Sequence, residues 1–583
     1  MPDLYEDNPD IRFLIRNMDI KDVVETMEDN FAQAKDYDYA PVDLADAVDN
    51  YDRILAMLGK MSGEFIEPRS EEVDRTGAKL VGKGVEYARG TAEAVRRLGK
   101  ADLMGFTLPR RFGGLNCPGL IYTAAIEMVS RADAALMNIF GLQGIAETVN
   151  EFADEDIKAE YLPRFCRGEV TAAMALTEPD AGSDLQAVQL KAIPGETEGL
   201  WYLKGVKRFI TNGCGEVLLV LARSEPDSDD GRGLSLLICD RGPTIKVRRL
   251  EDKLGIHGSP TCELQFNMTP ARLIGERRLG LIRYTMAMMN GARLGIAGQS
   301  LGIAESAYRE ALAYAHTREQ FGQLIKEFPA VAELLVGMKT RIEAGRVLTY
   351  QTALVVDRAR AYQVRLEKAK EGPDKELLKE LRAGFRKYEK LASLLTPLSK
   401  YYCSEMCNSV AYDAIQVLGG SGYMRDYKLE RLYRDARITS IYEGTSQLQV
   451  VAAITGLMAG NLSFGVEDVD LAGLPESLLP LKQELEKCFQ LMTGSVTAMK
   501  ARGDRGIIDL YARNAVDMAI DVYCGYLFLW CAVRDERKAQ VARKWIASAL
   551  PRIRMNAALI EQSDRTTLNS FNVITEEGQV AKA

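Results

Sequence analysis

A single glutamate between bulky apolar residues and a glycine is the first feature of this chain that could do chemistry. Residues 440–449 read SIYEGTSQLQ and place Glu443 between Tyr442 and Gly444. Apolar surroundings disfavour a charged carboxylate, so the pKa of Glu443 should be raised, which suits a base that removes a weakly acidic C–H proton. Gly444 would let the backbone approach a ligand closely. Taken alone, the segment could also be an exposed glutamate in a loop before a helix.

Two earlier segments could hold a flat, polar heterocycle. Residues 175–184, ALTEPDAGSD, place hydroxyl and backbone N–H donors in a tight loop. Residues 207–213, KRFITNG, place Phe209 two positions before Thr211, which suits stacking on a ring and bonding to its edge. Taken singly, the first could be a plain turn and the second an ordinary strand end.

Two later segments could contact phosphates. Residues 317–323, TREQFGQ, carry Arg318, which could pair with a diphosphate. Residues 416–423, QVLGGSGY, form a Gly-rich turn that could approach a phosphate or adenine, although such a turn is a weak signal by itself. A solvated arginine and a plain helix-ending turn are the alternatives.

Composition excludes several classes of protein. The chain has 583 residues, of which 47% are hydrophobic and 27% charged, so it is neither largely disordered nor fibrous. Its net charge of −8 argues against nucleic-acid binding, which needs a basic surface. With two histidines and no Cys-x-x-Cys among ten scattered cysteines, we expect no metal site and a reducing compartment.

The chain shows no targeting or membrane signal. Its N-terminus lacks a basic region followed by an apolar stretch. The longest apolar run, Val522–Val533, is shorter than the roughly 20 residues that a bilayer requires. We therefore expect no transmembrane segment and a cytoplasmic location.

Hydrophobic periodicity predicts the order α, β, α, α along the chain. A stripe of Val48, Tyr51, Leu55 and Leu58 is typical of a helix. Short Val-, Ile- and Leu-rich runs later predict strands at Glu216–Arg223, Leu234–Asp240, Thr244–Leu250 and Cys262–Met268. The densely charged stretch Arg365–Lys390, broken by Gly-Pro, predicts an exposed helical hairpin. The predicted divisions are an N-terminal extension (1–45), an N-terminal helical domain (46–170), a middle β domain (171–280), a C-terminal helical bundle (281–458) and a C-terminal helical extension (459–583).

The five segments, in this order and spacing, resemble the acyl-CoA dehydrogenase family of flavoproteins. The resemblance covers about Leu44 to Leu457. It implies an α+β multidomain fold with an N-terminal helical domain, a middle β domain and a C-terminal four-helix bundle. FAD would lie between the β domain and the bundle. The extra C-terminal helical region is typical of long subfamilies, in which it covers the surface used for tetramers, so we expect a homodimer.

The resemblance also implies roles for residues of the five segments. Leu176 and Thr177 would contact the pyrimidine side of the flavin, Phe209 would pack on the ring, and Thr211 would bond near N5. The other cofactor-binding residues that it implies are Gly182, Ser183, Arg318, Phe321, Gln416, Gly420, Thr445 and Gln447. Those of residues 318–321 and 416–420 would act across the dimer interface.

Glu443 matches the family's catalytic base. It would abstract the α proton of an acyl-CoA thioester while a hydride leaves the β carbon for flavin N5, which gives a 2-enoyl-CoA. Arg293 fits the family arginine near the base. Some relatives carry the base at the position of Ala292, and an alanine cannot take a proton. The substrate contacts that the resemblance implies are Ser183, Tyr442 and Gly444.

Electrons would pass from the enzyme to an electron-transferring flavoprotein. Two alternatives stay open: an acyl-CoA oxidase, which reduces oxygen, and a flavin-holding DNA-associated relative. Retention of Glu443 and a C-terminal extension that is close to neutral speak against the second. Glu127 stands where glutaryl-type relatives carry an arginine for a distal carboxylate, which disfavours a dicarboxyl substrate. The length and branching of the acyl chain stay open.

Overall fold

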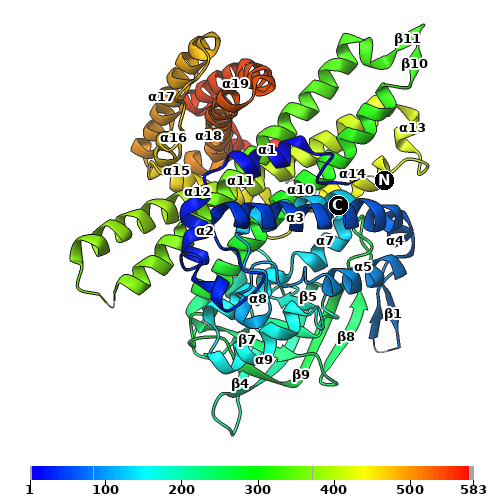
Figure 1. The fold of residues 1–583 in the computed structure, drawn as a ribbon, viewed down its shortest axis with the longest axis vertical. Coiled ribbons are helices and arrows are strands. Elements are labelled where there is room, and N and C mark those ends of the chain that lie inside the picture. Colours follow the sequence, from blue (N-terminus) through cyan, green and yellow to red (C-terminus); the bar gives the residue numbers. More distant parts are fainter. Residues whose placement is uncertain (1–2, 83, 371, 577–583) are drawn as a thin grey trace.

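The computed structural model describes residues 3–82, 84–370 and 372–576. In Figure 1 the β domain lies at one end of the molecule, the long helices of the bundle and the C-terminal extension lie at the other, and N-terminal helices lie between them. The order of helical, β and helical parts is that of the predicted fold class.

The N-terminal part is helical and carries one small hairpin, β1 (Lys79–Val81) with β2 (Gly84–Glu86). Tyr51, Leu55 and Leu58 of the predicted stripe are buried on one helix, Leu44–Met61. The helices are α1 (Pro9–Asn17), α2 (Lys21–Met27), α3 (Leu44–Met61), α4 (Ser70–Thr76), α5 (Arg89–Lys100), α6 (Gly119–Ala132), α7 (Ala134–Phe140), α8 (Gln143–Phe152) and α9 (Glu155–Cys166).

The N-terminal segment, which we predicted as an acidic extension, contributes to the main core. Its apolar residues Leu4, Tyr5, Leu14 and Val24 are buried in the same cluster as the bundle helices. The acidic composition hid this role, because the charged residues on α1 and α2 alternate with an apolar face.

The middle domain is a seven-stranded, mostly antiparallel sheet in the order β3-β6-β4-β5-β9-β7, in which β6 also pairs with β7 and β8 pairs with β9. The four predicted strands are confirmed, with shifted ends. Three more were missed, because β3 and β4 are four residues long and β5 carries three Lys and Arg residues. The strands are β3 (Ala172–Ala175), β4 (Lys191–Pro194), β5 (Leu200–Thr211), β6 (Val217–Arg223), β7 (Leu234–Asp240), β8 (Ile245–Leu250) and β9 (Thr261–Leu273).

The bundle is built on long helices that pack side by side. The predicted charged hairpin is confirmed: one helix ends at Ala369, the next begins at Lys375, and their ends project from the body of the molecule in Figure 1. The elements are α10 (Met286–Ala315), the short hairpin β10 (Glu319–Gln320) and β11 (Gln323–Leu324), α11 (Pro329–Ala369), α12 (Lys375–Leu418), α13 (Gly420–Tyr423), α14 (Leu429–Ile438) and α15 (Ser446–Met458).

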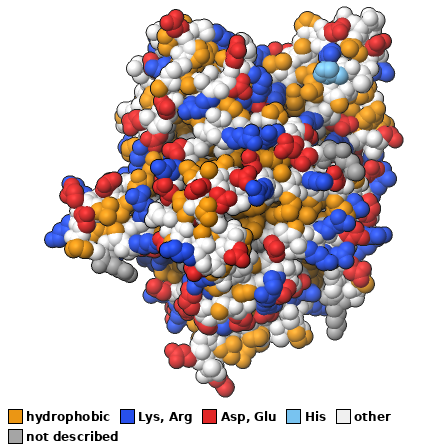
Figure 2. Space-filling model, viewed as in Figure 1, with side chains coloured by type: hydrophobic (Ala, Val, Ile, Leu, Met, Phe, Trp, Pro, Cys, Tyr) orange, Lys and Arg blue, Asp and Glu red, His pale blue; other side chains and the backbone are white. Residues whose placement is uncertain are grey.

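The C-terminal extension packs on the bundle, where its helix α18 contacts α15. Within the described residues, one helix, Arg505–Arg534, is long and apolar enough to cross a bilayer by length and composition, and 83% of its most apolar window is buried inside the protein. On the face drawn in Figure 2, basic and acidic side chains are interspersed, also over this part of the molecule. The helices are α16 (Leu462–Glu467), α17 (Leu479–Arg502), α18 (Arg505–Arg534), α19 (Glu536–Gln562) and α20 (Thr566–Ile574).

Buried ion pairs join the two ends of the chain to the bundle. Lys538 of α19 donates to Asp10 of α1 at 2.6 Å and to Glu343 of α11 at 2.7 Å. Deeper in, Arg346 donates to Glu127 at 2.6 Å and to Glu305 at 2.7 Å, and all three side chains are 1% exposed. Burial alone would raise the pKa of Glu305, but the neighbouring cations, Lys339 and Arg346 foremost, hold it well below its usual range.

Replacing Arg346 with Met should destabilise the protein strongly, because the buried Glu127 would lose the cation it pairs with and Glu305 would keep only Arg309. We expect a loss of roughly 3–5 kcal/mol, seen as a lower midpoint of thermal unfolding. The control is Arg53→Met, which removes a partner of Asp49 on the exposed face of α3 and should change stability by at most about 0.5 kcal/mol. Equal midpoints for the two variants would contradict the buried network.

Candidate active site

A cavity of about 1580 Å³ opens between the β domain and the bundle. Its walls come from α6 and α7, from the ends of β3 and β5, from the start of α10 and from the loop before α15. A pocket for a single small molecule usually has roughly 300–1,000 Å³. This cavity therefore has room for two ligands side by side.

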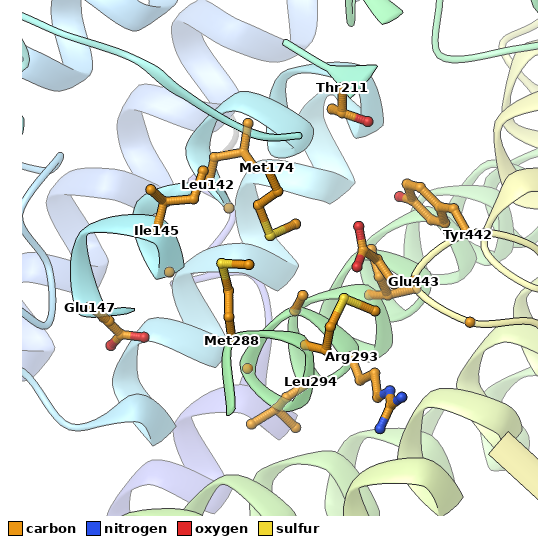
Figure 3. A pocket seen from close by; sticks show the side chains of 18 of the residues that line it. Leu142, Ile145, Glu147, Met174, Thr211, Met288, Arg293, Leu294, Tyr442 and Glu443 are labelled. Atoms are coloured by element: carbon orange, nitrogen blue, oxygen red, sulfur yellow. The ribbon is translucent and has the colours of Figure 1, made fainter. Parts of the chain in front are cut away.

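Glu443 lies in this cavity on a tight turn between α14 and α15. Glu443 and Gly444 have φ angles of 53° and 88°, in the left-handed region that non-glycine residues avoid. The Thr445 hydroxyl then caps α15 by accepting from the Leu448 N–H at 3.4 Å. In Figure 3 the Glu443 carboxylate points across the cavity toward Met174. The turn and the cap together hold the carboxylate in the cavity.

Burial raises the pKa of Glu443, and two cations, Lys400 and Arg293, partly offset that effect. Arg293 lies on α10, and burial lowers its own pKa while Glu443 raises it. Its guanidinium donates to Asn290 Oδ1 at 3.1 Å and in Figure 3 points away from the Glu443 carboxylate. The carboxylate therefore feels both charges, and neither cation forms an ion pair with it among the described residues.

Tyr442 is anchored behind the base. Its hydroxyl bonds to the side-chain oxygen of Gln299 and lies 3.1 Å from Asn138 Oδ1. Gln299 is tied in turn to the Ala134 carbonyl at 2.9 Å. Gln299 and Asn138 could not be predicted from the sequence, because they lie on α10 and α7, far from Tyr442 along the chain.

A buried lysine supports the strand end that faces the cavity. Lys207 Nζ donates to the Leu176 carbonyl at 2.7 Å and to Glu178 Oε1 at 2.9 Å. Arg208 N–H donates to the Thr177 carbonyl at 2.9 Å. Glu178, part of the predicted ligand loop, is therefore a structural partner of Lys207, while Leu176 and Thr177 line the cavity.

Phe209 stands out of the sheet into the cavity. The pairing of β5 with β9 is irregular between Lys207 and Ile210, and Phe209 has a φ of 59°. As a result the ring stays 52% exposed in a sheet whose neighbouring residue Ile210 is buried. An exposed aromatic face beside Thr211 fits stacking on a flavin ring.

The cavity brings together most of the residues singled out from the sequence. Besides Glu443, Arg293, Tyr442 and Phe209, the sequence-predicted residues that line it are Leu176, Thr177, Gly182, Ser183, Thr211, Gly444 and Thr445. The apolar walls add side chains that the sequence analysis missed, because they are spread over β3, α8 and α10: Leu142, Ile145, Met174, Met288 and Met289.

Five predicted cofactor residues do not line this cavity: Arg318, Phe321, Gln416, Gly420 and Gln447. Phe321 is 95% exposed on the turn between β10 and β11. A hydrogen bond of 3.4 Å between Tyr314 and Ser421 brings the end of α10 close to the Gly-rich turn. The first four residues therefore lie in exposed segments at one end of the bundle, where the resemblance has them act on a partner subunit.

Glu127 does not lie at the substrate site. It lies on the buried side of α6, where it bonds to Arg346 and Tyr350, while Thr123 and Ile126 of the same helix line the cavity. The prediction that Glu127 takes the place of a substrate-binding arginine is therefore wrong. The helix turns Glu127 toward the interior of the bundle, away from the cavity.

Three family models match the chain: the acyl-CoA dehydrogenase N-terminal domain at residues 50–169, the middle domain at 173–269 and the C-terminal domain at 282–370 and 378–456. The chain therefore belongs to the acyl-CoA dehydrogenase family. It is an FAD-dependent oxidoreductase acting on CH–CH donors, in a family of acyl-CoA and fatty-acid metabolism.

Individual relatives agree. An acyl-CoA dehydrogenase of Bacillus subtilis is 35% identical over 376 residues, which cover 63% of this chain and 90% of that protein. A chain from the solved structure of the electron transferring flavoprotein of Acidaminococcus fermentans has 30% identity and a TM-score of 0.59, over 70% of this chain and 97% of that one. The acyl-CoA dehydrogenase of Bacillus anthracis complexed with FAD has a TM-score of 0.73 at 21% identity and covers 88% of each chain, so the likeness of fold extends beyond the family-model segments.

Shortening Phe209 should weaken FAD binding, because the ring is the exposed aromatic face at the cavity. For Phe209→Ala we expect a dissociation constant for FAD raised roughly tenfold, from lost stacking and apolar contact. The measurement is a fluorescence titration of apoprotein with FAD. Phe209→Trp keeps an aromatic face and should bind within about threefold of the parent protein. Equal affinities for the Ala and Trp variants would show that the ring does not hold the flavin.

Proposed function

We propose that this protein oxidises an acyl-CoA thioester to the 2-enoyl-CoA, with Glu443 as the base that takes the α proton. The observation that carries the proposal is the Glu443 carboxylate in an apolar cavity that also contains Phe209 and Thr211. A carboxylate with a raised pKa in a water-poor site is a stronger base than one in water.

Backbone N–H groups beside Glu443 can polarise the thioester carbonyl. The carbonyls of Glu443 and Gly444 are bonded by Gln449 and Lys400, neither of which lines the cavity. Because the peptides are trans, the N–H groups of Gly444 and Thr445 point the opposite way. Within the described part of the chain, the N–H groups of residues 443–445 have no hydrogen-bond acceptor. They are available to stabilise the negative charge that develops on the thioester oxygen.

The cofactor fits the same cavity. Leu176, Thr177 and Thr211 offer edge contacts, and Phe209 offers an aromatic face, so these residues would hold the flavin ring. When bound, FAD supplies the acceptor for the hydride from the β carbon. The chain's own part is to orient the acyl group, to exclude water with the methionine-rich wall and to hold the proton on Glu443.

We further propose a cytoplasmic homodimer that passes its electrons to an electron-transferring flavoprotein. The similar chain in the Acidaminococcus fermentans structure supports the choice of electron acceptor. The exposed segments around Phe321 and Gly420 support a partner subunit, since they carry residues that the resemblance assigns to FAD but lie outside this chain's own cavity. All ten cysteines are free and buried, which agrees with a reducing compartment.

Glu443→Gln should keep FAD but lose reactivity, since an amide cannot accept the α proton. With a panel of acyl-CoA thioesters mixed anaerobically with the protein, we expect flavin bleaching in the parent protein and a rate lower by roughly 10²- to 10⁴-fold in the variant. The absorbance of bound FAD serves as the control for folding. Bleaching at the parent rate would show that Glu443 is not the base.

Electron transfer from the reduced protein should require a protein acceptor. We expect reduced enzyme to be reoxidised quickly by electron-transferring flavoprotein and slowly by oxygen, which stopped-flow absorbance can follow in parallel. Fast reoxidation by oxygen with formation of hydrogen peroxide would instead identify an acyl-CoA oxidase.

A further inference from the structure

Lys400 is a buried lysine with no role in the sequence analysis. It lies on α12, its side chain is 0% exposed, and its Nζ donates to the Gly444 carbonyl at 2.7 Å. Within the described residues no carboxylate lies within ion-pair distance of it. Burying an ammonium without such a partner is costly, so its place behind the turn calls for a functional reason.

From this geometry we propose that Lys400 is a positioning residue for the base: it pins the Glu443–Gly444 turn from behind and keeps the carboxylate ionised. The inference rests on the proposed function, in which Glu443 takes the α proton.

The first half of the proposal, that Lys400 holds the turn in position, follows from the backbone. Two successive residues, Glu443 and Gly444, have left-handed φ angles, and a glutamate adopts such a conformation only when the surroundings hold it there. Lys400 and Gln449 enforce it by bonding the two carbonyls. The Gly444 carbonyl accepts from Lys400 at 2.7 Å and from Gln449 at 3.1 Å, and in this trans peptide the Thr445 N–H points the opposite way.

The electrostatic half follows from the charges around the turn. Glu443 is acted on by Lys400 from α12 and by Arg293 from α10. Lys400 is acted on by Glu443, by Arg293 and by Glu405, which lies five residues along its own helix. Burial lowers the pKa of Lys400 to about 8. Lys400 is therefore charged at pH 7 and below, and in this range its charge favours the ionised form of Glu443.

Glu405 links this arrangement to the C-terminal extension. Its carboxylate accepts from Ser446 Oγ at 2.6 Å, at the start of α15, and from Arg513 of α18 at 3.4 Å. These contacts give the Glu405 carboxylate partners other than Lys400 and connect the start of α15 to α18.

Two substitutions separate the two halves. Lys400→Gln removes the charge and keeps an N–H donor, whereas Lys400→Met removes both at similar length. The control is Lys387→Met, a lysine of the same helix that pairs with Asp468 at the surface. The measurement is the rate constant of anaerobic flavin bleaching by a reactive acyl-CoA at saturating concentration, from about pH 5 to pH 9, on holoenzymes with equal FAD content.

Loss of the charge should raise the pKa of Glu443, so more of the base is protonated at a given pH. We expect the acid limb of the profile to move up by about one pH unit in both Lys400 variants. In the plateau above that limb, Lys400→Gln should react within about threefold of the parent, and Lys400→Met should be slower by roughly tenfold or more, because the turn is released. Lys387→Met should match the parent throughout.

If the acid limb of the pH–rate profile of Lys400→Gln stays where it is in the parent protein, Lys400 does not keep the Glu443 carboxylate ionised, and that part of the proposal is overturned. Equal plateaus for Lys400→Gln and Lys400→Met would overturn the positional half. If Lys400→Met does not fold with FAD, the acid limb of Lys400→Gln still decides the charge effect, and Lys400→Leu, which also lacks the donor to the Gly444 carbonyl, takes the place of Lys400→Met in the plateau comparison. Failure of the parent protein to bleach with any acyl-CoA would count against the proposed function instead.

Discussion

The structure depends on keeping one carboxylate buried, ionisable and correctly aimed. Removing Glu443 from water raises its proton affinity, which a base needs, but the same burial would neutralise it without compensating charge. Arg293 and Lys400 supply that charge from two helices and stay at a distance, so the carboxylate keeps its own lone pairs for a proton. A direct ion pair would have lowered the pKa of Glu443 and weakened it as a base.

The rest of the fold serves this arrangement. The bundle provides α10 and α12, whose cations approach the turn from two sides. The β domain provides Phe209, which an irregularity in strand pairing turns into the cavity. The C-terminal extension packs against α15, the helix that begins directly after the turn. Its buried ion pairs with α1 and α11 join the C-terminal part of the chain to the N-terminal part and to the bundle. Catalytic geometry and stability therefore share the same helices.

Functional residues within short segments could be predicted from the sequence, whereas contacts between distant segments could not. Glu443, Phe209 and Thr211 could be picked out because each lies in a short segment of unusual composition. Lys400 could not, since it is one lysine in a 44-residue helix, and its meaning comes from a carbonyl 44 positions away. Glu127 shows the same limit, because a small error of helical register separates the cavity wall from the ionic interior.

The most direct test of the central claim is a crystal structure of the protein with FAD and an unreactive acyl-CoA analogue. We expect the thioester between the flavin and Glu443, with a carboxylate oxygen roughly 3–3.5 Å from the α carbon and the ring packed on Phe209. An acyl chain bound with Glu443 on the same side as the flavin, or a flavin seated outside the cavity, would contradict it.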